Sequence, residues 1–174
     1  GASVLEAPQV DRGLLETIHP EPYVTALDYQ RGHFLAVAWM RHVLGGDLEE
    51  DRASAPDYVG SERGRLPREF TIDERLQRLE VAPFVLANLA RQSGTHAKRV
   101  QRYFVDMYRI FGVIARVLKE RRHAIIVVCP SHIRRVNIPT HHVFDEIGRA
   151  NGLRLKYRYS RTIYLGRRIL PYMQ

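Results

Sequence analysis

The sequence predicts an α/β protein in which part of a doubly wound sheet ends in an antiparallel hairpin. First, an amphipathic helix over residues 96–119 precedes a continuous, mostly β-branched run at 124–129, which is typical of a strand covered by helices. Second, a helix over 140–150 precedes a strictly alternating strand at 153–159 and a further strand at 162–169, and these two strands can pair antiparallel. The 174 residues have the size of a single domain that buries a substantial core.

The first part of the chain is organised around the segment Pro20-Glu21-Pro22-Tyr23. Residues 10–18 fit a short strand that leads into it. Each proline ring fixes φ and biases the preceding residue away from helix, so the segment is a stiff turn that presents the tyrosine ring. Apolar residues then recur at helical spacing over 27–44, and Gly45-Gly46 stops that helix. Residues 47–70 form an irregular loop segment rich in charge, glycine and proline.

The central helices have sequence signals at their ends. Thr71 and Glu74 have the spacing of a capping box, so a helix is expected to begin there. Pro83 should kink or divide this helix, and Gly94 should end it. One face of the next helix carries an aromatic-rich apolar stripe that we assign to the core, made of Val100, Tyr103, Phe104, Met107, Phe111, Ile114 and Leu118.

The second part of the predicted sheet follows this helix. The run at 124–129 is bounded by charged residues and a proline, and we interpret it as a strand buried on both faces. A loop with Arg134 and Arg135 comes next. Pro139 starts the following helix, and Asn151-Gly152 supplies its C-terminal stop.

The charge of the chain is divided unevenly between its two halves. The net charge is +8, but residues 1–90 carry 9 Lys/Arg against 15 Asp/Glu, whereas residues 91–174 carry 18 against 4. A basic half of this size predicts an anionic partner, of which nucleic acid is the commonest. A solvated basic surface and a face that pairs with an acidic domain are the alternatives.

Other features of the sequence exclude several classes of protein. No apolar run approaches the roughly 20 residues that cross a bilayer, and no basic-then-apolar leader opens the chain. We therefore expect no membrane partner. Cys129 is the only cysteine, which rules out an internal disulfide and a cysteine-rich zinc site and fits a reducing, cytoplasmic compartment. In a buried strand it would be an inert apolar residue. His141 and His142 are adjacent, so they would point about 100° apart on a helix and cannot chelate one metal.

Two segments are expected to meet at one edge of the sheet. In doubly wound sheets, ligands lie beyond the carboxyl ends of the strands. The segment 20–23 and the loop 130–139 each follow a predicted strand, so both should lie at that edge. A stiff turn that presents an aromatic ring suits the stacking of a planar ligand, and a loop with an anchored tyrosine is the simpler alternative. Residues 57–65, with two glycines and two arginines, suit either a loop near phosphates or a connector.

The motifs together carry a family resemblance. Pro20-Glu21-Pro22-Tyr23 is followed by Ala26-Leu27-Asp28-Tyr29, and later by the segments Tyr58-Val59-Gly60-Ser61-Glu62 and Arg116-Val117-Leu118-Lys119. In this order and spacing, the chain resembles the carboxy-terminal, catalytic half of S-adenosylmethionine-dependent DNA methyltransferases that modify adenine N6 or cytosine N4. Their catalytic motif is Asp/Asn/Ser-Pro-Pro-Tyr/Phe at a strand end. The similarity covers most of residues 14–171.

The resemblance implies a Rossmann-like methyltransferase fold and site-specific methylation of DNA, as in restriction-modification. The target base would be flipped out and stacked on Tyr23, with Pro22 shaping the turn. Carbonyl groups of Pro20 or Glu21 would accept hydrogen bonds from the exocyclic amine and orient its lone pair. The candidates for contacts with DNA phosphates are Arg31, Arg63, Arg65, Arg134 and Arg135.

Two departures from the family pattern bear on activity. Pro20 stands where the motif has its polar residue, and Glu21 stands where it has its first proline. Glu21 could supply a displaced carboxylate acceptor, and a degenerate site with little or no activity is the alternative. The chain also lacks the Gly-rich strand-to-helix turn that would hold the methionine part of the cofactor. We therefore expect the cofactor half on an upstream domain or a companion chain, and no methylation by this polypeptide alone.

The sequence leaves two other classes of function open. A non-catalytic nucleic-acid-binding or assembly module could keep a methyltransferase-like sheet without its chemistry. A basic structural subunit could instead pair with an acidic partner. Assembly into a homo-oligomer is compatible with each of these functions.

Overall fold

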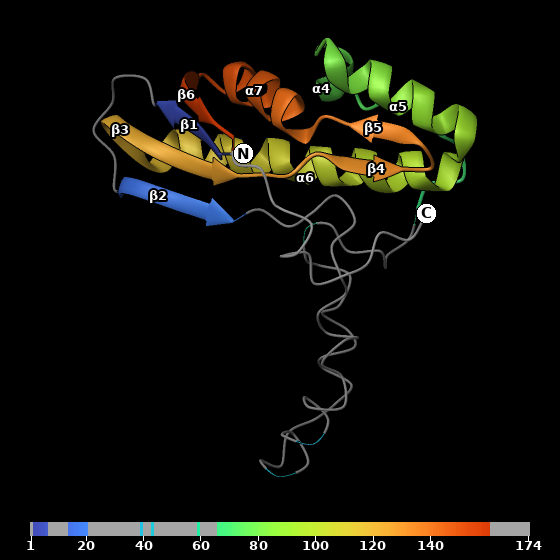
Figure 1. Cartoon of the computed structure of the whole chain (residues 1–174), viewed down its shortest axis with the longest axis horizontal. Coiled ribbons are helices and arrows are strands. Elements are labelled where there is room, and N and C mark those ends of the chain that lie inside the picture. The colour runs from blue at the N-terminus through green and yellow to red at the C-terminus, as the bar shows by residue number, and fades with distance from the viewer. Residues whose placement is uncertain are drawn as a thin grey trace.

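The computed structural model describes residues 2–6, 14–20 and 66–160, together with residues 39, 43 and 59 (Figure 1). Residues 39 and 43 are helical and exposed, within the range predicted as a helix. The rest of the helix predicted over 27–44, most of the segment 47–70 and the strand predicted over 162–169 lie outside the described residues.

Four strands form the main sheet, in the order β2-β3-β1-β6. Their bounds are Ala2–Glu6 for β1, Leu14–Pro20 for β2, Leu118–Val127 for β3 and Arg154–Tyr159 for β6. Strand β2 runs parallel to β3, whereas β1 runs antiparallel to both β3 and β6. The protein is therefore mixed α/β, but the described strands form a mixed sheet and do not show a doubly wound parallel one. Strand β1 was not predicted from the sequence.

Strand β3 differs from the prediction in length and in burial. It begins at Leu118, so it includes the charged residues that were expected to precede it. Ala124 and Ile126 are fully buried, but Val127 is 45% exposed, so burial alternates and the prediction of two buried faces was wrong. Cys129 follows the end of the strand and is exposed, which also corrects its predicted burial. An apolar run reveals that a strand is present, but the neighbouring elements decide which face is covered.

The segment predicted as a loop with two arginines is a β-hairpin. Strands β4 (Ser131–Ile133) and β5 (Val136–Ile138) pair antiparallel and form a second, two-stranded sheet. In Figure 1, β4 continues beyond the end of β3 and β5 folds back toward α7. The loop prediction was wrong because the turn lacks the glycine and asparagine that normally mark a two-residue hairpin.

Two helices span residues 74–92, so the predicted helix is divided, but the division precedes Val81 and does not fall at Pro83. Helix α4 (Glu74–Gln77) is a single turn, and α5 (Val81–Gln92) follows it. The N-cap of α4 is Asp73, whose side chain accepts a hydrogen bond from the backbone N–H of Arg75, so the capping box predicted at Thr71 was wrong. Pro83 lies in the first turn of α5, where a missing backbone N–H costs nothing.

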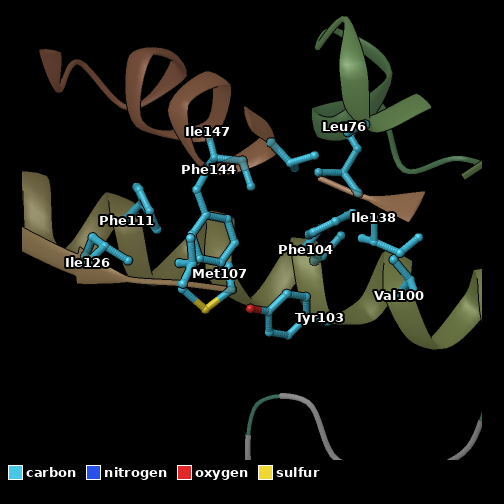
Figure 2. Packing of buried hydrophobic residues seen from close by; sticks show 14 of the residues in the cluster. Leu76, Val100, Tyr103, Phe104, Met107, Phe111, Ile126, Ile138, Phe144 and Ile147 are labelled. Atoms are coloured by element: carbon cyan, nitrogen blue, oxygen red, sulfur yellow. The ribbon is translucent and has the colours of Figure 1, made fainter. Parts of the chain in front are cut away.

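Helix α6 (Gly94–Val117) forms one side of the hydrophobic core. Every residue of the predicted apolar stripe is buried, which confirms its assignment to the core. Figure 2 shows these side chains meeting Phe144 and Ile147 of α7 (Thr140–Ala150) and Leu76 of α4. The ring of Phe144 lies 6.0 Å from that of Tyr103 and 5.2 Å from that of Phe111, measured between centroids.

Helix α7 has the predicted bounds, with Pro139 at its N-cap and Asn151 at its C-cap. Gly152 has φ of 80°, the left-handed conformation that glycine adopts without a steric penalty. Its N–H donates to the carbonyl of Arg149, and the N–H of Leu153 donates to the carbonyl of Gly148. These two bonds form a Schellman motif, which confirms the predicted stop and sends the chain into β6.

Candidate nucleic-acid interface

The parallel pair β2–β3 brings the ends of the two strands that precede the candidate segments to one edge of the sheet. Pro20, the last residue of β2, is the Cα partner of Val127, the last residue of β3. Because the two strands are parallel, the chain leaves both of them on the same side (Figure 1). The segment after Pro20 and the β4–β5 hairpin therefore start from neighbouring points, as the sequence analysis expected for residues that follow these strands.

Only some of the predicted site residues fall within the described part of the chain. Pro20, Arg134 and Arg135 are described. The remaining predicted positions lie outside the described residues, namely Glu21, Pro22, Tyr23, Arg31, Arg63 and Arg65.

Arg134 and Arg135 occupy the turn of the hairpin, and both have left-handed backbone conformations. Their φ angles are 49° and 62°, as in a type I′ turn, whose twist matches that of the two strands. This conformation is unfavourable for a residue with a β-carbon. Both side chains are exposed, and neither guanidinium pairs with a carboxylate within the described part of the chain.

The two faces of the hairpin have different characters. Ile133 and Ile138 are buried in the core, and Val136 packs against it. His132 and Asn137 are cross-strand partners, and both are exposed. These two residues were not among the site candidates predicted from the sequence. Alternation of apolar and polar residues on either side of Arg134 and Arg135 is a signal that could have revealed them.

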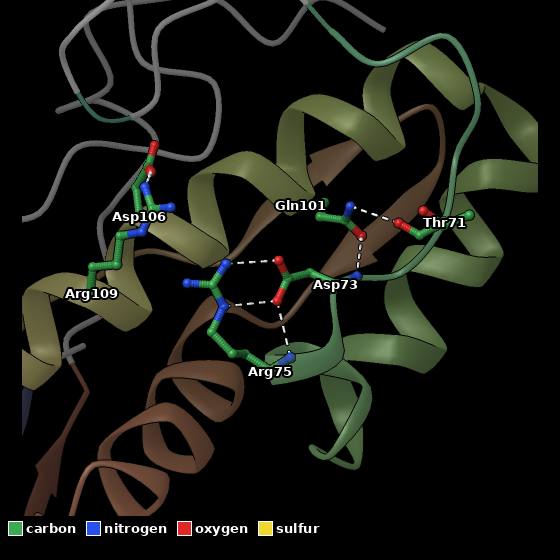
Figure 3. A network of polar contacts seen from close by, with 6 residues as sticks. All are labelled: Thr71, Asp73, Arg75, Gln101, Asp106 and Arg109. Atoms are coloured by element: carbon green, nitrogen blue, oxygen red, sulfur yellow. Dashed lines mark hydrogen bonds and ion pairs between the residues drawn. The ribbon is translucent and has the colours of Figure 1, made fainter.

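Positive charge dominates the sequence around the hairpin. No acidic residue occurs between Glu120 and Asp145, whereas this stretch holds four arginines and four histidines. Three arginines elsewhere in the described part of the chain, Arg75, Arg109 and Arg158, instead pair with carboxylates. Figure 3 shows Arg75 bonded to Asp73 through Nη2–Oδ2 and Nε–Oδ1 contacts of 2.8 Å and 2.9 Å, and Arg109 near Asp106. Each of these two arginines pairs with a carboxylate of its own helix or helix cap, so it carries less free charge for a partner.

The contact between Asp73 and Arg75 also changes the ionisation of both groups. The hydrogen bonds from the Arg75 side chain lower the pKa of Asp73 below 3.8. By the same interaction the pKa of Arg75 is raised. Gln101 of α6 ties this turn to the helix, because its Nε2 donates to the carbonyl of Thr71 at 2.8 Å.

A buried ion pair connects α7 to strand β6, which is the last strand in the described sheet. The carboxylate of Asp145 is almost fully buried and binds the guanidinium of Arg158 through Oδ2. Its Oδ1 is buried and has no hydrogen-bond partner in the described part of the chain. Because a lone buried carboxylate is costly, this pair fixes the position of β6 against α7.

Two histidines lie side by side at the start of α7. The rings of His141 and His142 lie 4.2 Å apart between centroids. Burial lowers the pKa of His141, and the neighbouring charges of His142 and Arg158 act in the same direction. Within the described residues, no group of three or more His, Cys, Asp or Glu side chains is placed to hold a metal ion. None of the described helices is both long and apolar enough to cross a membrane.

Comparison of the chain with models of known protein families, with curated proteins and with solved structures found no match. The methyltransferase resemblance therefore rests on the sequence motifs alone.

Proposed function

We propose that the chain is the catalytic, DNA-binding half of a methyltransferase that modifies the exocyclic amine of adenine or cytosine in double-stranded DNA. One observation carries this proposal. The segment Pro20-Glu21-Pro22-Tyr23 begins at the carboxyl end of β2, beside the carboxyl end of the parallel strand β3. That edge is where α/β sheets of the doubly wound kind bind their ligands.

The proposed role of the chain is to hold and orient the target base. Tyr23 stacks on a base flipped out of the duplex. The carbonyl groups of Pro20 and Glu21 accept hydrogen bonds from the exocyclic amine, so its lone pair points in one direction. The basic second half of the chain binds the flanking phosphates. S-adenosylmethionine would supply the methyl group.

The described residues do not fit a binding site for that cofactor. The one described turn from a strand to an α-helix, between Ile138 and Thr140, passes through Pro139 and contains no glycine. A Gly-rich turn is needed for a close backbone approach to the cofactor. In this proposal the cofactor half belongs to an upstream domain or a companion chain. Titration of S-adenosylmethionine into the chain should then give no saturable heat, and tight binding would contradict this division of roles.

Stacking of a flipped base on Tyr23 can be tested without the cofactor. A duplex with an adenine or cytosine opposite an abasic site should bind more tightly than a fully paired duplex, because the base no longer has to be unpaired. Tyr23→Ala should abolish that preference and weaken binding to the abasic duplex by about 5- to 100-fold. Tyr23→Phe, which keeps an aromatic ring, is the matched control. Equal binding of both duplexes by the unmodified chain would contradict the proposal.

A non-catalytic nucleic-acid-binding module is the second candidate function. It is favoured by Pro20 and Glu21, which replace the polar residue and the first proline of the family motif. Such a module would bind DNA through the same basic surface but would not flip a base out of the duplex. It would therefore bind paired and abasic duplexes equally, and Tyr23→Ala would leave both affinities unchanged.

A further inference from the structure

We propose that the β4–β5 hairpin is a DNA-reading ribbon that enters the major groove. Arg134 and Arg135 contact phosphates at the groove wall, while His132 and Asn137 contact the edges of bases. This inference rests on the proposed binding of duplex DNA, and it adds the element and the residues that distinguish one sequence from another.

The hairpin has the dimensions and the stiffness of a groove-reading element. A two-stranded ribbon fits the major groove of B-DNA, which is about 12 Å wide and about 8.5 Å deep. Three residues in each strand extend for roughly 10 Å, which is comparable to the groove width, so with the outer face against the bases the turn reaches the phosphates of the groove wall. The buried side chains of Ile133 and Ile138 attach the inner face of the ribbon to the core, so the outer face is presented without an ordering cost.

The outer face carries side chains with suitable hydrogen-bonding groups. His132 and Asn137 lie directly opposite each other, so their β-carbons are about 5 Å apart and project from the same face. The amide of asparagine matches the N6 and N7 atoms of adenine, and an imidazole ring donates or accepts one further hydrogen bond. Such a pair can read neighbouring positions in the groove.

The turn supplies the electrostatic part of the contact. Arg134 and Arg135 are exposed at the tip, and their guanidinium groups match phosphate oxygens in charge and geometry. The left-handed backbone of both residues fixes the direction in which the side chains leave the turn. Glycine and asparagine would fit this turn better, so two arginines here favour a role in binding over a role in folding.

The first experiment measures the salt dependence of binding to a random-sequence DNA duplex by fluorescence anisotropy. Arg134→Gln/Arg135→Gln should weaken binding about tenfold and make the slope of log K against log salt shallower by about 1.8, which corresponds to two phosphate contacts. Arg116→Gln/Arg149→Gln is the control, because it removes the same charge at a distance from the hairpin. Both arginines are exposed and lie in the last turns of α6 and α7, at the ends of these helices that are farther from the hairpin (Figure 1). The control should change the slope much less.

The second experiment measures specificity. Duplexes selected from the same random library by the unmodified chain should share a sequence preference. Asn137→Ala and His132→Ala should relax that preference at one or two positions and leave the salt slope unchanged. Circular dichroism and thermal unfolding of each variant check that the fold is intact.

The possible results distinguish a failure of the hairpin proposal from a failure of duplex DNA binding itself. If the unmodified chain does not bind duplex DNA, both fail. If it binds DNA, but the hairpin variants behave like the control, the hairpin inference is overturned and DNA binding stands. If the hairpin variants lose affinity for poly-glutamate as strongly as for DNA, the hairpin serves an acidic protein partner and the inference is again overturned.

Discussion

Phe144 shows how a single side chain holds the core together. It projects from α7 and contacts the rings of Tyr103 and Phe111 on α6. Because it is almost fully buried, Phe144→Ala would leave a cavity between the two helices, and we expect a loss of about 3–5 kcal/mol in the free energy of unfolding. Denaturant unfolding followed by circular dichroism measures this loss.

The control for this substitution is Phe84→Ala. Phe84 lies on α5 and is 69% exposed, so its removal should change the free energy of unfolding by less than about 0.5 kcal/mol. Equal destabilisation by the two substitutions would show that the core does not depend on the packing of α7 against α6.

Asp73 should make the free energy of unfolding depend on pH. Its pKa is lowered in the folded protein, so the folded state releases this proton more readily than the unfolded chain does. The stabilisation is therefore complete above about pH 4 and is lost as the pH falls through the lowered pKa. At pH 7, Asp73→Ala should cost about 1 kcal/mol, because the cap of α4 is also removed.

Asp73→Asn separates the cap from the charge. Asparagine caps a helix about as well as aspartate, so this variant should lose only the ion pair with Arg75. Urea unfolding from pH 7 to pH 2.5 should show the difference between the unmodified chain and Asp73→Asn shrinking at the acidic end. A difference that stays constant over this range would contradict the role of the charge.

Among the elements, the hairpin is expected to lower the stability of the fold through the backbone conformation of its turn and to strengthen DNA binding through its two arginines. Arg134 and Arg135 adopt a conformation that costs residues with a β-carbon roughly 1–2 kcal/mol each relative to glycine. Arg134→Asn/Arg135→Gly introduces the preferred type I′ pair, so it should raise the free energy of unfolding by about 1–2 kcal/mol. The same variant should bind DNA less tightly, because it removes two cations.

Thermal unfolding and DNA anisotropy on this one variant measure both effects. Arg134→Gln/Arg135→Gln keeps the backbone penalty and removes the same charge, so it should lose affinity without gaining stability. If Arg134→Asn/Arg135→Gly is less stable than the unmodified chain, then the turn is not strained in the way that its φ angles indicate.

At the scale of the whole molecule, the uneven charge distribution should dominate the interaction with DNA. Residues 91–174 contain 18 basic and 4 acidic residues, and the described part of this half forms α6, β3, the hairpin, α7 and β6. Binding of duplex DNA by the chain should therefore weaken steeply as salt rises, since each phosphate contact releases condensed counterions. A gel shift at increasing salt concentrations tests this expectation. An affinity that does not change with salt would contradict an electrostatic interface.

Features that depend on local interactions were predictable from the amino-acid sequence. The bounds of α7, the buried stripe from Val100 to Leu118 and the stop at Gly152 were predicted because helical periodicity and caps act within a few residues. Helix α6 was predicted to within two residues at each end, but Gly94, predicted to end the preceding helix, is its first residue. The strand that leads to Pro20 was also predicted, and with it the place where the candidate site begins.

The pairing of the strands and the burial of their faces could not be predicted in the same way, because both depend on the folded chain. The insertion of β1 beside β3, the exposure of Val127 and Cys129, and the conversion of the loop at Arg134 into a hairpin all depend on contacts between residues far apart in the sequence. A strand satisfies its hydrogen bonds with a partner that its own sequence does not specify, so its neighbours and its buried face are set by the rest of the fold. For the same reason, His132 and Asn137 became candidates only when their pairing across the hairpin placed them on one exposed face.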